Sequence, residues 1–112
     1  MPLYQGTHYT RTFILKDKST GGPVDISGWG FRAQFRDNLK DDEEVLELTT
    51  DNGGFLVSDG PNGELVMEIT ATQSDLLPLG KVVFDVLRTE IEDGPVFLFG
   101  GRLPVKRTVT RD

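Results

Sequence analysis

Cysteine is absent from the 112-residue chain, and histidine and tryptophan occur once each. Without cysteine there can be no disulfide, no thiolate nucleophile and no cysteine-ligated metal. A metal site usually needs several closely spaced ligands, so the single His8 is expected at the surface rather than in a metal or catalytic centre. We therefore expect no cofactor.

Long apolar runs are missing as well. No run approaches the ~18 residues of a membrane span, and the first residues lack the charged start and apolar stretch of a signal peptide. Positive charge is scarce, because 12 Lys and Arg against 18 Asp and Glu give a net charge of −6. Nucleic acids and anionic membranes bind clustered Lys and Arg. We expect neither of them as a partner. We also expect intracellular synthesis without export through a membrane.

Recognisable catalytic and phosphate-binding motifs are also missing. The chain contains no G-x-x-x-x-G-K-[ST] or G-x-G-x-x-G, and none of Ser27, Ser58 or Ser74 lies in G-x-S-x-G. Segments 58–64 and 91–95 contain Asp, Asn and Glu oxygens that could hold calcium but lack EF-hand spacing, so we interpret them as hairpin turns, with a calcium site as the alternative. We expect no enzyme, although a hydrolase with paired carboxylates stays open because acidic residues are plentiful.

What the sequence does contain is the pattern of β-strands. Trp29, Phe31, Ala33 and Phe35 alternate with small or polar residues, which is the period of a half-buried strand, and Trp29 is expected at the centre of the core. One helical turn is expected within 71–80. Further strands are expected at 10–16, 45–50, 55–58, 64–70, 81–90 and 96–109, the last with a bulge or bend near Gly100–Gly101.

Seven or so short strands separated by turn residues predict an all-β fold, an antiparallel immunoglobulin-like β-sandwich with one short helical turn. A chain of this length suits one domain with one modest core. We expect residues 10–105 to form the sandwich, residues 1–9 an N-terminal arm, and residues 106–112 a C-terminal tail.

Several stretches in a fixed order carry a family resemblance. RTFILKD is followed by GGPVDISGW and FRAQFR, then by NGELVMEIT with ATQSDLLPLGKVVFDV, and finally by FGGRLPV. This order resembles that of small virion proteins of tailed bacteriophages. It is similar to the N-terminal, baseplate-attaching domain of phage upper baseplate proteins. Those proteins usually continue into a helical or receptor-binding region, which is not found before Asp112, so we expect a stand-alone adaptor or decoration module.

The resemblance implies a non-enzymatic structural protein of the virion. Its partners would be other phage structural proteins and copies of itself, in a homo-oligomer or symmetric assembly, and a tail or baseplate position and a capsid position both stay open. A sheet edge could accept a neighbour's arm as an added strand. Candidate partner contacts are aromatic or charged residues outside the inferred core: Tyr4, His8, Tyr9, Arg32, Arg36, Lys106, Arg107 and Arg111.

A carbohydrate-binding module is the alternative function. A β-sandwich can present aromatic rings on which a sugar stacks, and Trp29, Tyr4 or Tyr9 would serve as that platform.

Overall fold

The computed structural model describes residues 2–37 and 44–107. Within them, two short helical segments connect strands: the 3₁₀ turn η1 (Gly60–Asn62) and the helix α1 (Ala71–Ser74). The strands of the described residues are β1 (Leu3–Tyr4), β2 (Tyr9–Ile14), β3 (Phe31–Arg36), β4 (Leu46–Thr49), β5 (Phe55–Asp59), β6 (Glu64–Ile69), β7 (Gly80–Arg88) and β8 (Val96–Lys106).

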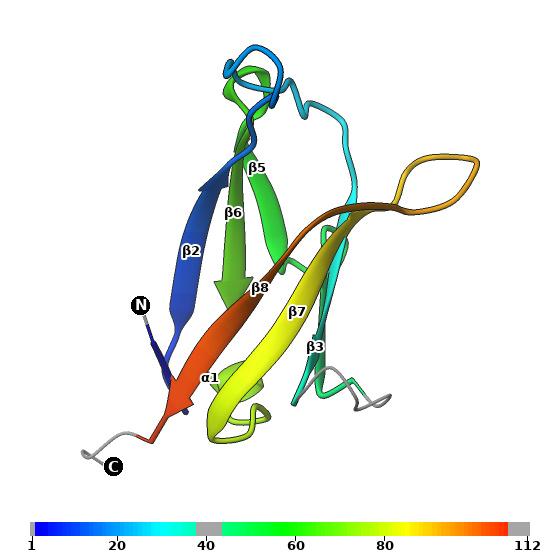
Figure 1. Cartoon of the computed structure of the whole chain (residues 1–112). Coiled ribbons are helices and arrows are strands. Elements are labelled where there is room, and N and C mark those ends of the chain that lie inside the picture. Colours follow the sequence, from blue (N-terminus) through cyan, green and yellow to red (C-terminus); the bar gives the residue numbers. More distant parts are fainter. Residues whose placement is uncertain (1, 38–43, 108–112) are drawn as a thin grey trace.

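The strands form two sheets that pack face to face (Figure 1). One has five strands in the order β1-β8-β7-β3-β4, and the other has three in the order β2-β6-β5. Every neighbouring pair is antiparallel except β1 and β8, which run parallel. The predicted all-β sandwich is confirmed. No helix in the described part of the chain has the length and apolar composition that crossing a bilayer requires.

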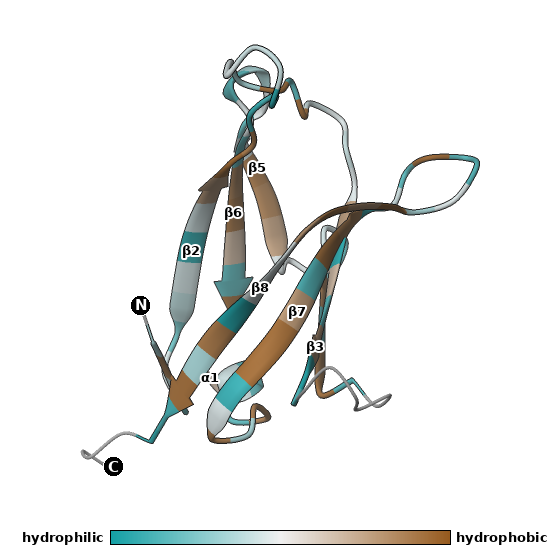
Figure 2. Ribbon diagram, in the orientation of Figure 1, coloured by the Kyte–Doolittle hydropathy of each residue, from teal (hydrophilic) through white to brown (hydrophobic). Residues whose placement is uncertain are grey.

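Buried and more exposed residues alternate along β3 and along most of β6 and β7, so each of these strands has one face toward the core. Figure 2 shows β7 and β8 as mainly hydrophobic strands interrupted by hydrophilic bands. Phe31, Ala33 and Phe35 of β3 are buried, as the sequence pattern predicts. Aromatic rings join the two sheets, with centroids 6.0 Å apart between Phe31 and Phe55. The other buried strand residues of the core are Leu3, Tyr9, Leu46, Leu48, Leu65, Met67, Ile69, Val82, Phe84, Val86, Leu103 and Val105.

The helical turn between β6 and β7 is also where the sequence predicts it. The Thr70 hydroxyl accepts a hydrogen bond from Gln73 N–H, and the Gln73 side chain accepts one from Thr70 N–H, which makes a capping box. Ser74 is buried, and its hydroxyl donates to the Ala71 carbonyl oxygen. The turn brings Leu77 under the sandwich, where it closes the core.

Two details of the predicted strands lie elsewhere in the structure. Trp29 lies before β3 and is only half-buried, packed against the core instead of at its centre. β8 continues without a break through Gly100 and Gly101, and its irregularity lies at Leu98, since Val86 pairs with Phe99 while Leu87 pairs with Phe97.

The segment predicted to be a free N-terminal arm is part of the sandwich. Leu3 and Tyr4 pair with Val105 and Lys106 at the end of β8, and Leu3 is fully buried. Tyr9 begins β2 and is only 7% exposed, because its position places the ring on the inner face of the three-stranded sheet. The expectation that Tyr9 lies outside the core is therefore wrong, and its burial does not favour Tyr9 as a partner contact or a sugar platform.

Candidate functional site

The outer face of the five-stranded sheet carries most of its basic side chains. Because Val82, Phe84 and Val86 face the core, the alternate residues of β7 point outward, and their partners on β3 and β8 point the same way. We call this surface the basic face, defined by Arg32, Gln34, Arg36, Lys81, Val83, Asp85, Leu87, Phe97, Gly100 and Arg102.

A shallow hollow of about 180 Å³ lies in the middle of the basic face. The Arg36 guanidinium donates to Gln34 Oε1 at 2.9 Å, and Gln34 Nε2 donates to Glu47 Oε2 at 3.1 Å, so these side chains form a row across β3 and β4. Arg32 Nε is buried beside the hollow and has no hydrogen-bond partner among residues 2–37 and 44–107. A buried donor without a partner lowers the stability of the fold.

The outer face of the three-stranded sheet has the opposite charge. Glu64 and Glu68 point outward from β6 on either side of Val66, and Leu56 of β5 pairs with Val66. Leu56 is 63% exposed, the largest exposed fraction among the large apolar side chains described. We call this surface the acidic face, defined by Thr10, Thr12, Ile14, Leu56, Asp59, Glu64, Val66 and Glu68.

An apolar groove of about 400 Å³ lies between the free edges of β2 and β8. Phe13 and Phe99 lie in it with ring centroids 4.9 Å apart. In the described residues, β8 is paired on this side only at Val105 and Lys106, where β1 lies. The remaining lining residues are Ile14, Leu15, Lys16, Val24, Trp29 and Leu98.

Only part of the free β8 edge can accept another strand. Gln5 N–H donates to the Lys106 carbonyl oxygen, so the main-chain groups of Lys106 face β1. Main-chain groups alternate sides along a strand, so those of Gly100, Arg102 and Pro104 face the open edge too. Pro104 has no N–H to offer, which limits strand addition to the stretch before it.

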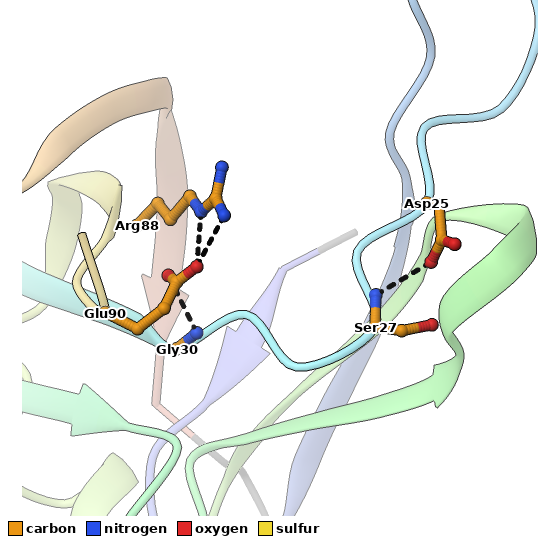
Figure 3. Close-up of polar contacts among 5 residues, drawn as sticks. All are labelled: Asp25, Ser27, Gly30, Arg88 and Glu90. Carbon is orange, nitrogen blue, oxygen red and sulfur yellow. Dashed lines mark hydrogen bonds and ion pairs between the residues drawn. The ribbon is translucent and has the colours of Figure 1, made fainter.

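Trp29 lies against a polar cluster at the end of β7. Figure 3 shows Arg88, Glu90 and Gly30 of this cluster. The Arg88 guanidinium carbon lies 3.7 Å from the centre of the Trp29 ring, a cation–π contact. Arg88 also donates to Glu90 Oε2 at 2.6 Å, and Gly30 N–H donates to Glu90 Oε1 at 3.1 Å. One ring face of Trp29 is thus covered by Arg88, which does not favour the carbohydrate-stacking alternative.

Hydrogen bonds lower the pKa of two carboxylates. Desolvation would raise the pKa of Glu90, but the hydrogen bonds from Gly30 N–H and Arg88 outweigh it and lower the pKa. The pKa of Asp25 is lowered by hydrogen bonds from the Ser27 side chain and N–H. Both carboxylates therefore favour their charged form. Their hydrogen bonds hold the loop before β3 in place.

The substitution Glu90→Gln is expected to flatten the pH dependence of stability. The folded-state pKa of Glu90 is lowered from its ordinary value of 4.5. Its contribution to the free energy of unfolding is therefore present above pH 4.5 and is lost as the pH falls through the folded-state pKa. Urea unfolding followed by Trp29 emission at neutral and acidic pH measures this. Glu92→Gln, in the same loop and exposed, is the control; an equal effect of both variants would contradict the prediction.

Four of the predicted contact residues gather at one end of the sandwich. Tyr4 pairs with Lys106, Arg107 follows directly, and Tyr4 and His8 line a common hollow with Thr7. His8 Nε2 lies 3.3 Å from Glu68 Oε1. Arg32 and Arg36 lie apart from this group on the basic face, and Arg111 lies outside the described residues.

Sequence reasoning missed the residues that make the two outer faces distinctive. Phe97 and Leu56 are the main exposed apolar side chains on them, and Glu64 and Glu68 give the acidic face its charge. The alternation of Glu64, Val66 and Glu68 with buried Leu65 and Met67 is the signal that could have identified the acidic face.

Within residues 2–37 and 44–107, no group of three or more His, Asp or Glu side chains is arranged to hold a metal ion. No protein-family model matches the chain, and no curated protein matches it.

Proposed function

We propose that the chain is a non-enzymatic structural protein of a tailed-bacteriophage particle, an adaptor or decoration module that binds neighbouring subunits. The observation that carries the proposal is the set of uncovered surfaces on a small sandwich. Both sheets have an outer face without a covering layer in the described residues, and each of these faces exposes a large apolar side chain: Phe97 is 60% exposed and Leu56 is 63% exposed.

The groove between β2 and β8 supports the same role. Exposed apolar surface bordered by polar groups is typical of protein interaction sites. Here the groove lies beside an unpaired stretch of β8, so an extended segment of a neighbour could gain both apolar contacts and main-chain hydrogen bonds. Gly100 and Arg102 would supply those hydrogen bonds.

The family resemblance in the sequence is the reason for proposing a phage particle. It covers the strands from β2 to β8 and includes the PVDISGW segment that leads into β3. A β-sandwich alone serves many functions, so the particle assignment depends on the resemblance and on the uncovered surfaces together.

An antibody against the purified chain tests the proposal on phage particles from a lysate of the strain that carries the gene. We expect the chain to co-sediment with the particles, and gold-labelled antibody to mark one part of them. Labelling across the head with a copy number in the hundreds indicates the capsid, whereas a small number that follows tail symmetry indicates the tail or baseplate. Particles that lack the chain altogether would refute the proposal.

A further inference from the structure

We propose that copies of this chain stack face to face, with the acidic face of one copy seated on the basic face of the next. The inference deepens the proposed function, and it depends on that function for its biological setting. It commits to one occupant of both faces, a second copy of this chain, because the two faces match each other in charge, in spacing and in apolar content.

The charges of the two faces are complementary. The basic face and the β4 side chain next to it hold four basic side chains against two acidic ones, although the whole chain has a net charge of −6. The residues that define the acidic face include Asp59, Glu64 and Glu68 and no Lys or Arg. Opposite charges on facing surfaces steer association and fix its register. The six charged side chains of the first set are Arg32, Arg36, Lys81, Arg102, Glu47 and Asp85.

The spacing of the charges is the same on both faces. Glu64 and Glu68 are four residues apart on β6, with Val66 between them, and Arg32 and Arg36 are four residues apart on β3. At a rise of ~3.3 Å per residue, each pair spans ~13 Å. Sheets that pack face to face keep their strands within ~30° of each other, so two carboxylates can meet two guanidinium groups along one strand.

Apolar side chains lie beside the charged strand on both faces. Leu56 and Ile14 flank β6 on the acidic face, and both are exposed. Val83 and Leu87 lie beside β3 on the basic face, and exposed Phe97 pairs with Leu87. Stacking would remove these side chains from water.

This contact joins two different surfaces, so it is heterologous. Such a contact generates a ring if the rotation between copies closes, and a filament if it does not. The smaller face is ~20 Å long and ~14 Å wide, from six-residue strands at ~3.3 Å rise and ~4.8 Å spacing. That is less than the ~800 Å² per partner of a standard interface, so free copies are expected to associate weakly and more strongly at low salt.

Charge reversal tests the inference by analytical ultracentrifugation at low salt, at concentrations up to about 1 mM. We expect wild-type protein to associate, and Glu64→Lys/Glu68→Lys and Arg32→Glu/Arg36→Glu each to weaken association more than about tenfold. An equimolar mixture of the two variants should regain association, because the unchanged basic face of the first variant meets the unchanged acidic face of the second, and the two reversed faces also attract each other. Circular dichroism checks that each variant is folded.

A second pair of variants tests the apolar part of the same contact. Leu56→Lys should weaken association as well, whereas Leu76→Lys should not, since Leu76 is 59% exposed but lies on neither face. Wild-type protein that stays monomeric up to about 1 mM overturns the inference, as does association that the charge reversals leave unchanged. A monomer that still labels particles would overturn the stacking alone; stacking without particle labelling would overturn the proposed function alone.

Discussion

Replacing Phe35 with alanine is expected to lower the free energy of unfolding by about 3–5 kcal/mol. Phe35 lies on β3 and is fully buried, and its ring stacks on Phe84 of β7 with centroids 5.0 Å apart. Truncation removes the ring's burial and leaves a cavity that neighbouring strands cannot fill without losing their own pairing. Urea unfolding followed by circular dichroism measures the loss of unfolding free energy. An unchanged slope of that free energy against urea concentration would show that the native state stays compact.

The same truncation at Phe97 is the matched control. Phe97 is 60% exposed on the basic face, so alanine there should change the free energy of unfolding of the monomer by no more than about 0.5 kcal/mol. Equal losses at the two positions would contradict the assignment of Phe35 to the core and Phe97 to the outside. Phe97 is therefore available for binding, since removing it disturbs no internal packing.

The alternation of residues predicts which face of a strand is buried, as Phe31, Ala33 and Phe35 illustrate. It does not predict where the strand begins. Trp29 continues the period in the sequence, yet its N–H donates to the Ile26 carbonyl oxygen in a turn, so the backbone is not extended there. The ring consequently lies at the side of the core, under the Arg88 guanidinium.

The outward position of Phe97 could not be predicted from the sequence. Residues 96–99 are four apolar residues in a row, and such a run carries no period from which to assign faces. Pairing with β7 decides which way each side chain points, because the irregularity at Leu98 lets Phe97 face outward and Phe99 inward. Gly100 and Gly101 suggest a bend, but Gly101 instead makes room for Phe84, whose Cζ would lie 2.7 Å from a Cβ at that position.

Long-range pairing explains the other differences. Leu3 and Tyr4 pair with residues about a hundred positions later, which no local pattern contains, so the segment before β2 is integral to the fold although the sequence predicts an arm. Arg32 and Arg36 alternate with the apolar residues of β3, and this alternation does predict that both point away from the core. That they belong to a basic face, and that an acidic face of matching spacing lies on the other sheet, follows only from the strand order.

In residues 2–37 and 44–107, no other element of the chain forms a layer over the outer face of either sheet. The described helical segments are a three-residue turn and a four-residue helix, each at the end of a strand. The outer faces and the groove between β2 and β8 thus offer three separate contact surfaces on one domain. A module of a symmetric particle needs at least two, one toward its copies and one toward a different neighbour.

Replacing Gly63 with alanine is expected to lower the free energy of unfolding by ~2–5 kcal/mol, for two separate reasons. Gly63 follows η1 with φ of +73°, a left-handed conformation that costs other residues ~1–2 kcal/mol. A Cβ there would also lie 2.6 Å from the Leu15 carbonyl oxygen and 2.8 Å from that of Val24, both of which belong to backbone and cannot rotate away. The hydrogen bond from Leu15 N–H to the Gly63 carbonyl oxygen, 2.9 Å long, would be strained as well.

Gly53→Ala separates the two reasons. Gly53 has φ of +83°, but a Cβ at this position would have no neighbouring atom within 4 Å, so only the conformational cost of ~1–2 kcal/mol applies. Thermal and urea unfolding of the two variants, measured side by side, should show that Gly63→Ala is clearly less stable than Gly53→Ala. Equal stabilities would contradict the close packing of residues 15–24 against the turn between β5 and β6.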